Sequence, residues 1–189
     1  MNTSYSPDEL HQLGFASIGR HVLVDRTARF FGVENLQIGD HTRIDAYCVL
    51  SAGAGGIFVG SYVHLSVGVS IVGAGSVVIE DFAGLSGKVS VFSSNDDYAG
   101  GAMTNPTVPR EFRNVTDAAV VIRRHAVVGA GSVILPGIEI GIGAAVGALT
   151  VVRKSVGEFV IVAGNPMVEI GSRGRQMLEH ENQIRMHHD

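Results

Sequence analysis

Aliphatic residues recur every six positions along most of the chain. Six consecutive members of this series are all β-branched, namely Ile122, Val128, Ile134, Ile140, Val146 and Val152. A period of six matches neither the 3.6-residue period of a helix nor the alternation of a long strand. It is typical of a β-helix, in which a short strand, a turn and the next short strand follow one another around a shared axis.

Shorter runs in the same phase precede residue 122 and are separated by a few extra residues. With three faces per coil, the runs predict about six triangular coils and three buried columns. The predicted columns are Val59, Ile79, Ile122, Ile140; Leu65, Leu85, Val128, Val146; and Ile71, Val91, Ile134, Val152. An antiparallel sandwich is the alternative, but its strands are longer and would not keep six strides in phase. We therefore expect an all-β parallel β-helix.

Three segments leave the repeat and divide the chain. Residues 92–121, which include Asn105 and Pro106, predict a long excursion from a β-helix that spans residues 18–157. Residues 1–17 predict an N-terminal helical cap, with Ser6 as the capping residue, Pro7 at the first helical position and Glu9 three residues after the cap. Residues 158–189 predict a C-terminal strand and a short helix. We expect the two ends to cover the open ends of the stack.

Composition narrows the class of protein. The chain has 189 residues, 46% hydrophobic and 17% charged, with a formal net charge of −4. These values favour one folded domain and argue against a nucleic-acid partner, which would need a basic stripe. The only cysteine, Cys48, excludes an intramolecular disulfide framework. Without a signal-peptide pattern or an apolar run long enough to span a bilayer, we expect a cytoplasmic protein with no membrane insertion.

Two stretches resemble a known family. The segment 127–138, VVGAGSVILPGI, and the segment 162–166, VAGNP, are similar to the left-handed parallel β-helix acyltransferases with hexapeptide repeats. The nearest resemblance is to the maltose, galactoside and xenobiotic acetyltransferases and to the N-acetyltransferases of nucleotide amino sugars. The resemblance implies a left-handed helix and a homotrimer with its active sites between subunits. It also implies acetyl-CoA as the co-substrate, no metal, and an excursion that reaches a neighbouring subunit.

The resemblance also implies a cofactor site. Ala130 and Ala148 match the small residues against which the pantetheine arm lies, although a turn also favours small residues. Arg153 and Lys154 match the phosphate-contacting positions, or else form a solvent-exposed corner. Pro166 falls near the adenine end, where Met167 and Val168 replace the arginine that often follows this proline in the family.

The candidate catalytic base is not where the resemblance would place it. Galactoside-type relatives carry a histidine in the excursion, whereas this excursion contains none. His64 lies at an outward position of a hexapeptide and is the candidate base, since an exposed imidazole is basic near neutral pH. A surface histidine without a role is the alternative.

The start of the excursion predicts a substrate site. Its candidate residues are Asn95, Asp96, Asp97 and Tyr98. Two carboxylates attract an ammonium group, which favours a cationic acceptor. A capped turn is the alternative, because Asn and Asp are common in turns.

These features predict an acetyl-CoA-dependent acetyltransferase that N-acetylates a nucleotide-linked amino sugar for bacterial surface polysaccharide. The alternative is a sugar O-acetyltransferase of the galactoside or maltose type. A metal enzyme like the γ-class carbonic anhydrases is a lesser alternative, because His21, His41, His64 and His125 are too widely spaced to supply its zinc ligands. A non-enzymatic solenoid is also a lesser alternative, since it would not need the excursion.

Overall fold

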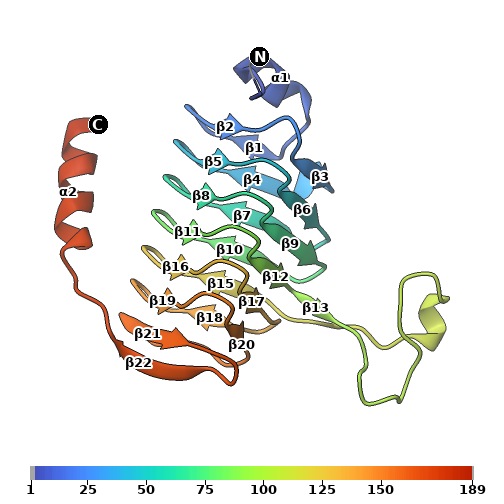
Figure 1. Ribbon diagram of the computed structural model, residues 1–189. Coiled ribbons are helices and arrows are strands. Elements are labelled where there is room, and N and C mark those ends of the chain that lie inside the picture. Colours follow the sequence, from blue (N-terminus) through green and yellow to red (C-terminus); the bar gives the residue numbers. More distant parts are fainter. Residues whose placement is uncertain (1–2, 189) are drawn as a thin grey trace.

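The computed structural model describes residues 3–188 and shows a three-sided parallel β-helix (Figure 1). Residues 1–2 of the expected N-terminal cap and residue 189 lie outside the described residues. The first face stacks β1 (Ser17–Ile18), β4 (Leu36–Ile38), β7 (Ile57–Val59), β10 (Val77–Ile79), β15 (Val120–Ile122) and β18 (Glu139–Ile140). The second stacks β2 (Leu23–Val24), β5 (Arg43–Ile44), β8 (His64–Leu65), β11 (Gly84–Leu85), β16 (Val127–Val128) and β19 (Ala145–Val146), followed by β21 (Val160–Ala163) and β22 (Val168–Ser172). The third stacks β3 (Arg29–Phe31), β6 (Val49–Ala52), β9 (Ser70–Gly73), β12 (Ser90–Phe92), β17 (Val133–Ile134) and β20 (Val151–Val152).

The strand register confirms the three predicted columns. Ile79 pairs with Val59 on one side and Ile122 on the other, and the equivalent pairings place Leu85 between Leu65 and Val128. The third column likewise places Val91 between Ile71 and Ile134. These inward side chains are at most 4% exposed, so the repeat forms one continuous apolar core along the axis.

One corner carries a stack of rings. The stack runs through His21, His41, Tyr62, Phe82 and His125, whose neighbouring ring centroids lie 4.7–5.2 Å apart. Each of these residues has a φ between 57° and 60°, a backbone conformation that costs free energy for side chains with a Cβ. Ring stacking offsets part of that cost at this corner between the first and second faces.

The N-terminal cap contains α1 (Pro7–Gln12), and its predicted start is confirmed. The Ser6 hydroxyl accepts a hydrogen bond from the Glu9 backbone N–H, and the Glu9 carboxylate accepts one from the Ser6 N–H. Leu10 is buried against the first coil. The reciprocal pair satisfies two N–H groups that would otherwise lack partners, and it fixes where the helix begins.

The segment between β12 and β15 forms an arm that projects away from the prism (Figure 1). Its base is an antiparallel ribbon of β13 (Ser94–Asn95) and β14 (Thr116–Asp117), and it contains the 3₁₀ helix η2 (Arg110–Phe112). Another 3₁₀ helix, η1 (Val33–Asn35), lies within the first coils. The exposed side chains of the arm include Tyr98 at 88%, Met103 at 58% and Phe112 at 57%.

The C-terminal end departs from expectation. Strands β21 and β22 form an antiparallel hairpin that extends the second face beyond the last coil. The helix α2 (Met177–His188) was expected to cover the open end, and this was wrong: α2 lies along the side of the stack (Figure 1). Ion pairs from Glu181 and Arg185 to residues of earlier coils hold it there, and the hairpin occupies the end instead.

Candidate functional site

His64 lies on the outward side of β8, with half of its side chain exposed. Its Nε2 atom is 2.8 Å from Oδ2 of Asp45, which follows β5 one coil earlier. The other carboxylate oxygen, Oδ1, accepts a hydrogen bond of 2.7 Å from Nε of Arg43. The imidazole therefore stands at the surface with one ring nitrogen held by a fixed carboxylate.

Asp45 is the residue that sequence reasoning missed. Partial burial raises the pKa of Asp45, but the hydrogen bonds from His64 and Arg43 outweigh it and leave the pKa below its usual value. The carboxylate is therefore ionised near neutral pH. The coil repeat of about 20 residues was the signal that could have found Asp45, because it lies 19 residues before His64 and thus on the adjacent coil.

The predicted acceptor residues lie at the root of the arm. Ser94 links the arm to the prism, because its hydroxyl accepts from the Ala74 N–H and donates to the Asp117 carboxylate. Oδ1 of Asp97 accepts a hydrogen bond of 2.8 Å from the Ala99 N–H, as in a capped turn. Asp96 and Asp97 are half-buried, whereas Asn95 and Tyr98 are exposed. The arm thus presents its polar residues from a structured base.

The small residues predicted beside the pantetheine arm lie on consecutive coils. The Leu149 N–H donates to the Ala130 carbonyl, so the turn that carries Ala148 stacks directly on the turn that carries Ala130. Gly129 keeps the two turns in close contact, since a Cβ there would lie 2.4 Å from the Ala148 nitrogen. Both alanine side chains are exposed, so this corner is a shallow, smooth strip of backbone.

The charged residues predicted for the nucleotide end come together. A cavity of about 480 Å³ is lined by Arg153, Lys154, Pro166 and Met167. The first two follow β20, and the last two lie between β21 and β22. Met167 occupies the place where relatives often have an arginine, so the cavity combines two cations with an apolar wall.

The structure does not join all predicted residues within one chain. Among residues 3–188, no hydrogen bond or ion pair connects the arm residues 95–98 with His64. His64 lies on the second face, whereas the arm leaves from the end of the third. A site that uses both groups of residues needs a second copy of the chain.

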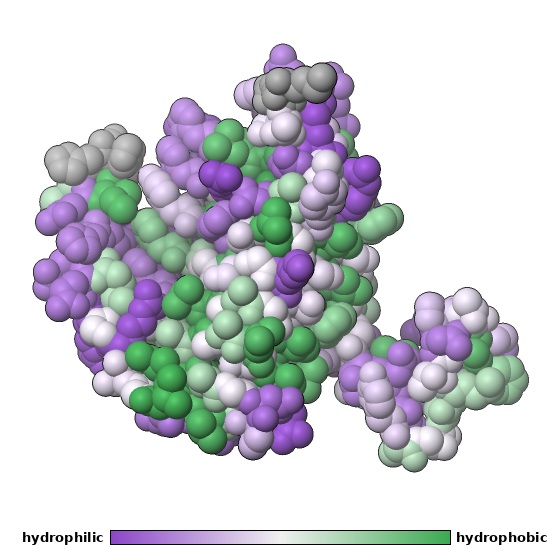
Figure 2. All heavy atoms as spheres, viewed as in Figure 1, coloured by the Kyte–Doolittle hydropathy of each residue, from purple (hydrophilic) through white to green (hydrophobic). Residues whose placement is uncertain are grey.

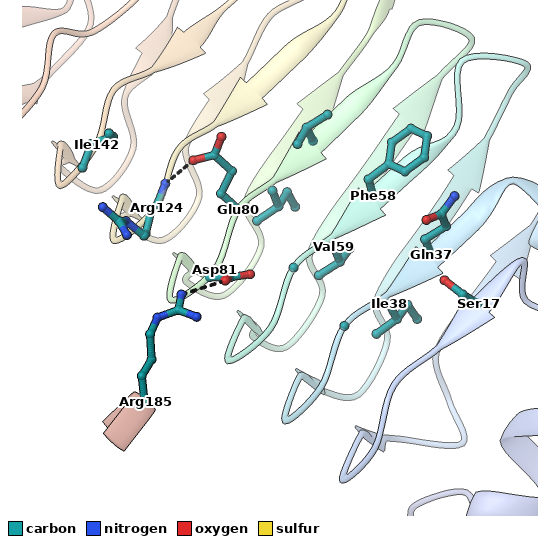
Figure 3. A pocket seen from close by; sticks show the side chains of 14 residues that line it. Ser17, Gln37, Ile38, Phe58, Val59, Glu80, Asp81, Arg124, Ile142 and Arg185 are labelled. Carbon is teal, nitrogen blue, oxygen red and sulfur yellow. Dashed lines mark hydrogen bonds and ion pairs between the residues drawn. The ribbon is translucent and has the colours of Figure 1, made fainter. Parts of the chain in front are cut away.

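A second cavity, of about 530 Å³, runs along the first face beside α2 (Figure 3). Its floor is formed by outward residues of four strands, including Gln37, Phe58 and Val78. Arg185 reaches from α2 to the Asp81 carboxylate, and the Arg124 N–H donates to Glu80. Sequence reasoning did not find this groove, because α2 was expected at the end of the stack.

A buried ion pair attaches α2 to the prism. Nε2 of His125 lies 2.7 Å from Oε2 of Glu181, and the two side chains are only 7% and 4% exposed. Arg124 and Arg185 also contact Glu181. Burial raises the pKa of Glu181, but the hydrogen bonds from His125 and Arg185 outweigh it and lower the pKa overall. His125, expected to be an ordinary polar turn residue, is therefore a structural anchor.

Replacement of the buried carboxylate in Glu181→Ala should release α2 at pH 7. Removal of one partner of a buried pair costs about 3–5 kcal/mol, which exceeds what this largely polar helix gains elsewhere. In the wild-type protein the same release is expected as pH falls through the lowered pKa of Glu181, because the ionised form is the one that binds. Limited proteolysis and hydrogen exchange of residues 177–186 measure it.

The matched control is Glu179→Ala, which removes an exposed carboxylate from the same helix. Equal protection of α2 in both variants would contradict the anchoring role of Glu181.

The comparisons with known proteins identify the family. A dTDP-4-amino-4,6-dideoxy-D-glucose acyltransferase from Escherichia coli is 42% identical over 174 residues, which cover 92% of this chain and 91% of that protein. The chain belongs to the hexapeptide-repeat acyltransferases. A lipopolysaccharide biosynthesis O-acetyl transferase from Escherichia coli K12 is 33% identical over 70% of this chain and 66% of its own length. No family model matches the sequence.

Solved structures of acyltransferases agree with this assignment. AntD, an N-acyltransferase from Bacillus cereus, superimposes with a TM-score of 0.92 at 35% identity, and the match covers 97% of both chains. That structure contains dTDP and 3-hydroxybutyryl-CoA, and a second contains dTDP-4-amino-4,6-dideoxyglucose and coenzyme A. The predicted left-handed β-helix and the predicted acyltransferase activity are confirmed. The family is that of N-acyltransferases for nucleotide-linked amino sugars.

Two further searches of the structure concern metals and membranes. Within residues 3–188, no group of three or more His, Cys, Asp or Glu side chains is arranged to hold a metal ion. In the same part of the chain, no helix has the length and apolar character needed to cross a membrane.

Proposed function

We propose that the protein transfers an acetyl group from acetyl-CoA to the amino group of a dTDP-linked 4-amino-4,6-dideoxy sugar. The observation that carries this proposal is the 42% identity, along nearly the whole chain, with an acyltransferase named for that sugar. The solved N-acyltransferase complexes, which contain the same amino sugar and coenzyme A, support it. The expected role in surface-polysaccharide synthesis suits such an acetylated sugar nucleotide.

Coenzyme A is proposed to lie along the last coils. The exposed strip at Ala130 and Ala148 accommodates the pantetheine arm, because no side chain beyond a methyl group obstructs it. Arg153 and Lys154 then meet the phosphates in the cavity that they share with Pro166 and Met167. Pro166 and Met167 offer an apolar wall for the adenine ring.

The working form is proposed to be a homotrimer. Apolar surface remains exposed toward the β21–β22 end of the stack (Figure 2), where Leu149, Val168 and Ile170 are 76%, 55% and 61% exposed. Contiguous apolar surface on a soluble chain marks an interaction site. A neighbouring copy would also cover the projecting arm, and would bring its Asp96 and Asp97 toward the reacting groups. The free, buried thiol of Cys48 is compatible with a reducing cytoplasm.

The proposed chemistry needs one proton acceptor. The sugar nitrogen attacks the thioester carbonyl carbon, the C–N bond forms, the C–S bond breaks, and coenzyme A leaves as the thiol. His64 accepts the proton that the nitrogen loses. Asn95, Asp96, Asp97 and Tyr98 hold the acceptor, since the carboxylates attract its ammonium form before deprotonation.

The test is a comparison of two acceptors that differ at one atom. With acetyl-CoA, dTDP-4-amino-4,6-dideoxyglucose should give a kcat/KM at least roughly 100-fold above that of the 4-hydroxyl analogue, because a site built for an amine leaves its polar groups unpaired with the wrong partner. Release of the coenzyme A thiol measures both reactions, and mass spectrometry of the product locates the acetyl group.

Preference for the hydroxyl analogue would contradict the proposal. It would favour the O-acetyltransferase alternative, which is the activity named for the 33% identical relative.

A further inference from the structure

The carboxylate of Asp45 is held from two directions by different side chains. Arg43 Nε donates to Oδ1 at 2.7 Å, and His64 Nε2 lies 2.8 Å from Oδ2. The Asp45 side chain is 18% exposed, against 50% for His64 and 62% for Arg43. The least mobile member of the group is therefore the carboxylate in the middle, and the more exposed imidazole is oriented by it.

We infer that Asp45 is a positioning residue that fixes the tautomer of His64, so that Nδ1 is the basic atom. This inference rests on the proposed role of His64. An ionised carboxylate can only accept hydrogen bonds, so the contact at 2.8 Å requires Nε2 to carry the proton. In a neutral imidazole the other nitrogen is then the acceptor.

The surroundings leave His64 accessible on its other flank. Gly84 on β11 is the register neighbour of His64, opposite Arg43 on β5. A Cβ built on Gly84 would have no atom within 4 Å, so open space lies beside the imidazole. An approaching amino group can occupy that space without displacing a side chain.

The charged groups around the pair are few. Among residues 3–188, Arg43 binds Asp45 directly, and Asp25 shares with both of them a small cavity of about 220 Å³. Burial raises the pKa of the nearby Cys48 thiol to about 11, so that group is neutral at working pH. The imidazolium that forms during the reaction therefore gains its main compensation from Asp45.

A surface ion pair without function is the competing interpretation. Such pairs contribute little to stability, and their removal leaves kinetics unchanged. A positioning role predicts instead that the effect of Asp45 depends on His64. The two interpretations therefore separate in a double-mutant cycle.

The first experiment is kinetic. Asp45→Asn should lower kcat roughly 10-fold with an unchanged KM for acetyl-CoA, and the acidic limb of its pH–rate profile should move to lower pH. In the His64→Ala background, Asp45→Asn should have no further effect. Asp40→Asn, which removes an aspartate paired with Arg20 on a neighbouring coil, is the control and should leave kinetics unchanged.

The second experiment reads the tautomer without activity. Long-range ¹H–¹⁵N NMR of ¹⁵N-histidine-labelled protein should show His64 as the Nε2–H tautomer, assigned by its absence in His64→Ala. In Asp45→Asn the signal should move toward a mixture of tautomers.

The outcomes separate the inference from the proposed function. An Asp45→Asn effect of equal size with and without His64, or an unchanged tautomer in that variant, would overturn the positioning role. A fixed tautomer that depends on Asp45, together with full activity of His64→Ala, would retain the orientation but reject His64 as the base.

Discussion

Deletion of residues 96–114, with Asn95 and Val115 joined by two glycines, should leave a folded prism that has lost acyl transfer by at least roughly 1,000-fold. Well-oriented reactants account for much of an enzymatic rate, and the arm carries the residues proposed to hold the acceptor. The prism should persist because each coil contacts only its neighbours. Asn95 and Thr116 are paired in the ribbon, so the new turn closes a short existing gap.

Three measurements check this expectation. Coenzyme A release reports activity, circular dichroism reports the β-helix, and light scattering reports a particle of about three times the 19.9 kDa chain. A matched variant, Asp96→Asn with Asp97→Asn, keeps the arm and should raise the KM for the amino sugar while the KM for acetyl-CoA stays constant. Loss of the folded trimer in the deletion variant would show that the arm is structural. A 20 kDa wild-type monomer would remove the proposed shared site.

Replacement of the proposed base in His64→Ala should lower kcat roughly 100-fold at pH 6 to 7, with a smaller loss at pH 9. Positioned proton transfer contributes about 100- to 10,000-fold for a hydroxyl nucleophile. An amine needs less help, because a growing fraction of it is neutral as pH rises. The difference between wild type and variant should therefore narrow with increasing pH, measured by coenzyme A release.

His180→Ala is the control, since it removes an exposed imidazole from α2. Wild-type activity of His64→Ala across the whole range would show that His64 is only a surface residue. An equal loss at every pH, together with a silent Asp97→Asn, would favour a hydroxyl acceptor.

Much of the fold follows from local pattern. The six-residue stride is visible because every inward position faces the same apolar axis, so selection for burial repeats at each face. The pairings of Ile79, Leu85 and Val91 with their neighbours follow from counting alone, despite the extra residues at some corners. The start of α1 at Pro7 was also predictable, because the capping pair of Ser6 and Glu9 is local.

The candidate site was predictable only in part. Grouping of Arg153, Lys154 and Pro166 came from resemblance, and the shared cavity places them together. The contact between Asp45 and His64 depends on how consecutive coils align, and corner insertions change the spacing between coils. An aspartate one coil away is thus indistinguishable in sequence from any other corner aspartate, until the register is known.

The hydrophobic period determined by itself that this chain stacks into a β-helix, because inward burial is the same requirement in every coil. Tertiary structure decided where the polar groups meet. Glu181 reaches His125 across 56 residues and fixes α2 along the side of the stack, a contact that no periodic pattern encodes because one buried carboxylate needs only one matching partner. The arm likewise has a defined root at Ser94 and Asp117, but its polar residues meet His64 only if a second copy supplies the geometry.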